Sequence, residues 1–207
     1  MFLIIGIVVI TIMVMLKTSL SLGKQIENKR YLELGLEMEQ FKNIKREVVK
    51  AVDISYFNSS NMTDNAENFL RFVRRSMKAT AMDFNALMVG SIFPNVTADV
   101  ETKLNVTALN LLGVDIRNLT LTFNSSTRSF LSREDGTVIE TDFIFNTSSD
   151  FNSSLTVFYL TAYENRTENV SIPIEIGKSK FIGFFDLRLV TSGQEQRDSF
   201  IKTYILP

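Results

Sequence analysis

The chain has 207 residues, a formal net charge of -1 and 45% hydrophobic residues, enough for one domain plus an extension. It has no cysteine, histidine or tryptophan, which excludes a disulfide framework and removes the commonest general base and metal ligand. The charge is too close to zero to attract nucleic acid. We therefore predict that the chain is not an enzyme and that it needs neither cofactor nor metal.

The first sixteen residues form an uncharged, proline-free apolar run. As a helix this run is about 24 Å long, slightly short for a membrane span, although an extension to residue 23 could cross. A cleaved signal peptide fits poorly, because no basic region precedes the run and no cleavage site follows it. Basic residues follow the run and none precedes it, so the positive-inside rule would place the rest of the chain in the cytoplasm, in conflict with an extracellular head. A short basic leader that once preceded Met1 and was removed would resolve this conflict. Met1 could equally be the initiator methionine.

Helical spacing continues from the apolar run to about residue 54, as an amphipathic segment. A helix of that length exceeds what one small domain can cover, so its N-terminal half needs another partner. Residues 55–63 are predicted to form a loop, followed by a second helix over about 65–91 with Asp64 and Glu67 as a capping pair. Its basic side chains, Arg71 among them, are expected to be solvated or salt-bridged.

From about residue 97 the pattern changes to the two-residue alternation of strands. We expect seven or eight strands in an antiparallel sandwich, with 155–163 central and the strand containing Pro173 at an edge. Asp135 and Gly136 are predicted to turn a hairpin; calcium binding by the acidic residues there is a weaker alternative. The predicted class is α+β, with an N-terminal helix (1–54) and a head (55–207) that is β-rich over 97–207.

Asparagine carries the strongest functional signal. Ten of the sixteen asparagines begin an N-x-S/T sequon, where chance would give about three. In two predicted strands the sequon asparagines share the polar face, so glycans would project outward. We therefore predict an extracellular head with N-linked glycans at Asn58, Asn61, Asn95, Asn105, Asn118, Asn124, Asn146, Asn152, Asn165 and Asn169.

The layout of apolar helix, amphipathic continuation and β head resembles the type IV pilin superfamily, within it the archaeal pilins and archaeal flagellins. The resemblance covers the whole chain but includes no diagnostic motif. Ile5 stands where bacterial pilins usually carry glutamate, and the helix predicted at 65–91 is additional to the simplest pilin layout. The resemblance implies a membrane-inserted precursor, a pilus assembly machinery and a self-polymer outside the cell.

The favoured function is thus a structural subunit of an extracellular helical filament for adhesion or motility. The alternative is a membrane-anchored surface glycoprotein whose β-rich head binds a ligand. In the filament, the apolar side chains of the first sixteen residues would pack in the core. These residues are Phe2, Leu3, Ile4, Ile5, Ile7, Val8, Val9, Ile10, Ile12, Met13, Val14 and Leu16.

Overall fold

A computed structural model describes residues 2–57, 62–79, 82–132, 135–191 and 194–206. For residues 2–14, 16, 26, 30 and 32–34 it describes the backbone alone. The chain divides into two units, Met1–Asn43 and Ile44–Pro207. The elements in chain order are α1 (Phe2–Phe57), α2 (Met62–Lys78), β1 (Asp83–Phe93), β2 (Thr102–Leu111), β3 (Ile116–Phe123), β4 (Ser126–Ser132), β5 (Val138–Phe145), β6 (Phe151–Leu160), β7 (Asn165–Ile174), β8 (Ser179–Val190) and β9 (Glu195–Leu206).

The first unit consists of helix: within its described residues, no element other than α1 occurs. Several of its large apolar side chains are exposed, namely Met15, Leu20, Leu22, Tyr31, Leu36 and Met38. Among the residues whose side chains are described, no helix is both long enough and apolar enough to span a membrane.

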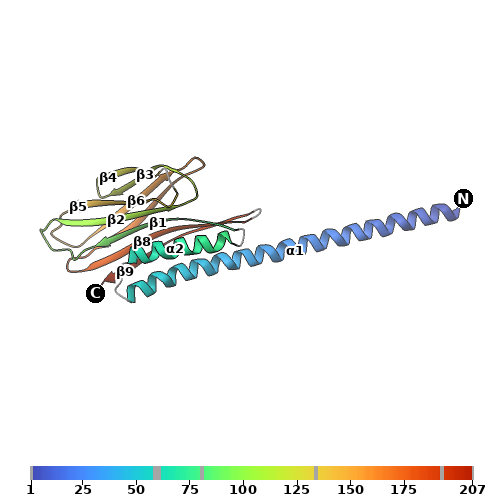
Figure 1. Cartoon of the computed structure of the whole chain (residues 1–207), viewed down its shortest axis with the longest axis horizontal. Helices are drawn as coiled ribbons and strands as arrows, with labels where there is room; N and C mark the ends of the chain where they lie inside the picture. Colours follow the sequence, from blue (N-terminus) through green and yellow to red (C-terminus); the bar gives the residue numbers. More distant parts are fainter. Residues whose placement is uncertain (1, 58–61, 80–81, 133–134, 192–193, 207) are drawn as a thin grey trace. The chain divides into compact units, whose positions relative to one another are not determined.

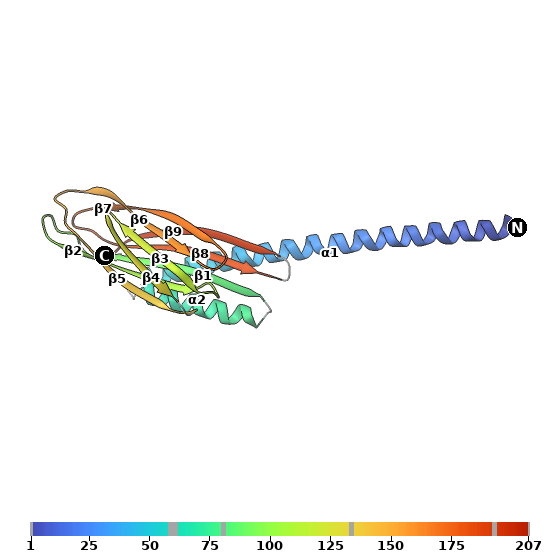
Figure 2. The same ribbon diagram turned by 90° about the horizontal axis from the view of Figure 1, so that it is seen from above.

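The second unit is built on two antiparallel sheets, shown in two views in Figures 1 and 2. One sheet has five strands in the order β5-β2-β1-β8-β9, and the other has four in the order β4-β3-β6-β7. Alternate residues of each strand point to the space between the sheets, as the two-residue period requires. They form one continuous core, to which Leu104, Leu121, Val157, Ile172 and Phe184 belong.

The outer face of the five-stranded sheet is covered by helix. Figure 1 shows α2 running along this sheet, and α2 packs against β1. The buried α2 residues Ala66, Leu70 and Val73 provide the helix side of this layer, and Phe84 and Met88 are buried outer-face residues of β1. Each helix thus buries one stripe, as expected for a surface helix.

The predicted α+β class is wrong. More of the described residues lie in strands than in helices, and two antiparallel sheets form the body of the fold. The structure is therefore classed as mainly β. Strand content was underestimated because β1 was assigned to a helix.

The helix predicted over 65–91 is the specific error. The structure ends α2 at Lys78 and places residues 83–93 in β1, between β2 and β8 of the five-stranded sheet. Both faces of β1 are buried, so its apolar residues do not alternate with polar ones, and such a run is hard to distinguish from a buried helix. Asp64 also lies inside the first turn of α2 instead of preceding it.

Two strand predictions are confirmed and one is corrected. β6 lies between β3 and β7, and β7, which contains Pro173, is an edge strand. Gly136 has the positive φ of 87° expected of a tight turn. The strands on either side of this turn, β4 and β5, belong to different sheets, so the turn joins the two layers and is no hairpin.

Candidate functional site

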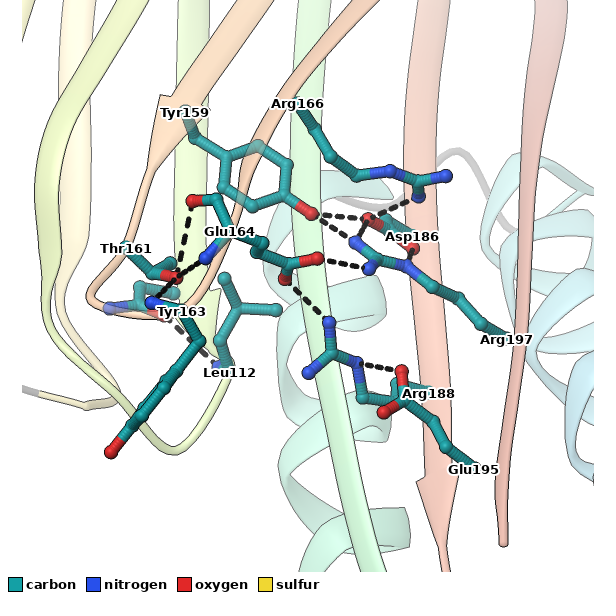
Figure 3. A network of polar contacts seen from close by, with 11 residues as sticks. Leu112, Tyr159, Thr161, Tyr163, Glu164, Arg166, Asp186, Arg188, Glu195 and Arg197 are labelled. Atoms are coloured by element: carbon teal, nitrogen blue, oxygen red, sulfur yellow. Dashed lines mark hydrogen bonds and ion pairs between the residues drawn. The ribbon is translucent and has the colours of Figure 1, made fainter.

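The most elaborate polar cluster is a network of seven side chains between the sheets, shown in Figure 3. The four-stranded sheet and its β6–β7 turn supply three members, and strands β8 and β9 of the five-stranded sheet supply four. The three carboxylates and three guanidinium groups balance in charge. The members are Tyr159, Glu164, Arg166, Asp186, Arg188, Glu195 and Arg197.

Asp186 is the centre of this network, with a side chain that is only 1% exposed. Arg197 donates from Nε to Oδ1 at 2.9 Å and from Nη2 to Oδ2 at 2.5 Å, which is a bidentate pair. Tyr159 donates its hydroxyl to Oδ2 at 2.7 Å, and Arg166 lies 3.3 Å from the same oxygen. The buried carboxylate is therefore fully satisfied.

Glu164 links the two arginines of the five-stranded sheet. Its two carboxylate oxygens accept hydrogen bonds from Arg197 and Arg188, each at 2.5 Å. The β6–β7 turn fixes its position, because the Glu164 amide donates to the Thr161 hydroxyl at 3.1 Å and Thr161 donates its own amide to the Glu164 carbonyl at 2.8 Å. Glu195 completes the network 2.9 Å from Arg188.

The pKa values of the two groups at the centre of the network, Asp186 and Tyr159, are shifted in opposite directions from their ordinary values. Burial alone would raise the pKa of Asp186, but hydrogen bonds from Arg197 and Tyr159 outweigh burial and hold this pKa below its ordinary value. Burial, together with the hydrogen bond to Asp186, raises the pKa of Tyr159 far above its ordinary value. Tyr159 is therefore not an activated nucleophile, and the network acts as a clamp between the sheets.

The sequence analysis named none of the network residues. A signal was nevertheless present, because Asp186 falls on the same strand parity as Ile182 and Phe184, which lie in the core. A charged residue in a core position of a strand needs a partner of opposite charge. The spacing does not identify that partner, since Glu164, Arg166 and Arg197 come from other strands and from a turn.

The sequons mark a second candidate functional surface, the outer face of the four-stranded sheet. Asn118 in β3, Asn152 in β6, and Asn165 and Asn169 in β7 lie opposite in parity to the buried residues of the same strands. All are exposed except Asn118, which is partly buried. Four predicted glycan sites are thus brought onto one face.

The other described sequons lie in β2 and in loops. Four further asparagines are exposed: Asn95, Asn105, Asn124 and Asn146. Asn124 occupies the turn between β3 and β4 with a positive φ of 53°, a conformation that asparagine tolerates well. Asn58 and Asn61 lie outside the described residues. The described strands β8 and β9 contain no sequon.

A shallow basic hollow of about 220 Å³ lies between α2 and the β4–β5 turn. Arg71 pairs with Glu67 at 2.8 Å and donates to the Gly136 carbonyl at 2.7 Å, and Arg74 pairs with Asp135. These contacts confirm that salt bridges occupy part of the basic face. Asp135 also accepts a hydrogen bond from the Gly113 amide, which agrees with a role in the turn.

One group of predicted residues remains to be placed. The twelve side chains predicted to pack in a filament core, from Phe2 to Leu16, lie outside the described side chains. In the described part of the chain, no three acidic, histidine or cysteine side chains are grouped so that they could hold a metal ion.

Comparisons of the chain with protein-family models, curated proteins and solved structures found no match.

Proposed function

We propose that this chain is a structural subunit of an extracellular, N-glycosylated helical filament that assembles through its N-terminal helix. The observation that carries the proposal is the first unit, Met1–Asn43, which contains only helix and exposes large apolar side chains such as Leu20, Tyr31 and Leu36. A helix with exposed apolar residues and no partner in its own unit requires a partner from outside.

Other copies of the same helix are suitable partners. The uncharged run from Met1 to Leu16 can enter a helix bundle without burying an unpaired charge. Burial of large apolar side chains contributes roughly 1.5–3 kcal/mol each relative to water, which favours a very stable polymer. Identical subunits that meet through contacts that do not close form a helical filament. Assembly through the N-terminal helix is what the resemblance to archaeal pilins and flagellins implies. The proposal takes this mode of assembly from the resemblance and makes no claim about a shared head fold.

The head, in this proposal, forms the glycosylated exterior. Exposure of seven of the eight described sequon asparagines supports this role, because an N-linked glycan needs a solvent-facing site. Before assembly, the apolar helix would hold the subunit in the membrane, where the assembly machinery would take it up.

Electron microscopy of material sheared from producing cells tests the proposal. Wild-type cells should release filaments that contain this chain, identified by mass spectrometry. The Val8→Asp variant should release none, because it places a charge inside the bundle. A matched control is Val100→Asp, at a position that is 52% exposed in the head, which should assemble normally.

The proposal fails if Val8→Asp subunits still assemble, or if no sheared filament contains the chain. Recovery of all the wild-type protein from membranes, as monomers, would favour the alternative of an anchored glycoprotein with a binding head. The amount of each variant in the membrane fraction must be measured as well, to separate failed assembly from failed production.

A further inference from the structure

Strand β9 is an open edge of the five-stranded sheet. It pairs with β8 over twelve residues, from Glu195 opposite Val190 to Leu206 opposite Ser179. Among the described residues, no strand pairs with its other side. Every second residue of β9 therefore directs its amide and carbonyl groups to an unoccupied edge, where a further strand could add.

One face of this edge strand is apolar and bare. Ile201 and Thr203 pair with Phe184 and Ile182, which lie in the core between the sheets. Opposite residues share a face, so Ile201, Thr203 and Ile205 continue that core surface. The four-stranded sheet does not cover them: Ile201 is 46% exposed and Ile205 is 52% exposed.

The other face of β9 is occupied within the subunit. Phe200 stacks on Phe185 with ring centroids 5.1 Å apart, and Tyr204 stacks on Tyr56 at 5.0 Å. Asp198 pairs with Lys45 at 2.5 Å. The bare apolar strip is therefore confined to one face and to the open edge.

The other three sheet edges are protected in ways that β9 is not. β7 carries the sequons of Asn165 and Asn169 and also Pro173, and its added glycans would block pairing. β5 carries Glu140 and Asp142 and is followed by a sequon, while β4 has only seven residues. β9 has neither proline nor sequon. Its charged residues contact partners within the subunit: Glu195 and Arg197 belong to the clamp, Asp198 pairs with Lys45, and Lys202 lies 3.8 Å from Asp53.

We propose that β9 pairs antiparallel with β9 of a second copy of this chain, about a two-fold axis at Thr203. This register places each Ile201 opposite the Ile205 of the other copy, so the bare strips cover one another. On the opposite face it places Phe200 against Leu206 and Lys202 against Tyr204. A two-fold axis at Lys202 would oppose two lysines, and one at Asp198 would oppose two aspartates.

This contact goes beyond the proposed filament function and does not require it. A helical filament whose subunits all point the same way contains no two-fold axis across its length. The contact would therefore join heads that belong to different filaments or heads of subunits that have not yet assembled.

The absence of cysteine makes cross-linking a direct test. The full chain carrying Thr203→Cys, purified in mild detergent, is treated with a short thiol-specific cross-linker and run on a denaturing gel. We expect a covalent dimer, with the two cysteine peptides joined in mass spectrometry. A matched control is Thr127→Cys, which places a cysteine at an exposed position of β4, an edge strand of the other sheet. The control should stay monomeric.

The register is tested in the Thr203→Cys background. Ile201→Lys alone and Ile205→Glu alone should each slow cross-linking roughly tenfold, because each puts a charge against an isoleucine of the other copy. The double variant should restore it, because the new lysine and glutamate face one another across the axis. Circular dichroism confirms that each variant is folded.

Three results would overturn the inference. The first is a folded Thr203→Cys protein that cross-links no faster than the Thr127→Cys control. The second is cross-linking that neither single charge slows, and the third is a double variant that remains as slow as the single ones. None of these depends on whether filaments form, so failure here is distinct from failure of the proposed function.

Discussion

At the scale of single residues, the head is sensitive to changes in the charges that are paired inside it. Asp186 accepts from two arginines and a tyrosine while almost entirely buried. A buried pair of this kind adds modest net stability, but removal of one partner leaves the other charge without compensation. The network is therefore sensitive to the loss of any central member.

Replacement of Asp186 by alanine should lower the free energy of unfolding of the head by about 3–5 kcal/mol, because Arg197 and Arg166 lose their buried counter-ion. Denaturant unfolding at pH 7, followed by circular dichroism, measures the change. The exposed Asp115→Ala serves as the control and should change the free energy by less than about 0.5 kcal/mol. A loss below about 1 kcal/mol for Asp186→Ala would contradict the assignment of the network as a clamp.

Acid should destabilise the head in a defined window. Hydrogen bonds from Lys178 and Lys180 lower the pKa of Glu175 from 4.5 to about 2 in the folded chain. A carboxyl whose pKa is lower when folded stabilises the fold above its unfolded pKa and loses that contribution as the pH falls. The pKa of Asp186 is also lowered, so its contribution has the same sign.

Thermal midpoints measured from pH 7 to pH 2 should therefore change little down to about pH 4.5 and then fall. Glu175→Gln should reduce the fall between pH 4.5 and 2, because the titrating group is gone. Glu101→Gln, at an exposed position directly before β2, is the control and should keep the wild-type slope. Identical slopes for wild type and Glu175→Gln would show that this carboxyl is not a source of acid sensitivity.

At the scale of elements, the sequence predicted the strands that have one polar face. β3 and β7 alternate apolar and polar residues, and both were located with their outward sequons on the correct face. β1 was missed because Phe84, Ala86 and Met88 on one face and Leu87 and Val89 on the other are all buried. Burial on both sides removes the two-residue period on which the prediction depended.

The polar elements of the site show a related limit. Asp186 and Arg188 can be recognised in the sequence as charges in core positions of a strand, but their partners cannot. The partners arrive through the β6–β7 turn and through β9, whose positions depend on the order of strands in two sheets. The exposure of Ile201 and Ile205 could not be predicted either, because it depends on how far the four-stranded sheet extends over β9.

At the scale of the whole molecule, the chain combines a head built on two sheets with a unit in which α1 is the only element among the described residues. The head pairs charges between its sheets and carries the eight described sequon asparagines. Several apolar side chains of α1, among them Leu20, Tyr31 and Leu36, are exposed. In the proposed function, the N-terminal helix drives assembly and the head forms the glycosylated surface. Each of these two roles can be tested without changing the other unit.

Proteolysis should distinguish the free subunit from the assembled one. Trypsin should cut a detergent-solubilised subunit rapidly after Lys17 and Lys24, which are exposed in a helix that nothing in its unit supports and that can therefore open locally. In sheared filaments these sites should be protected, since neighbouring helices would surround them. Lys178, exposed in the turn before β8 of the head, is the internal control and should be cut equally in both states. Equal cleavage after Lys17 in filaments and in free subunits would exclude the N-terminal helix from the filament interior.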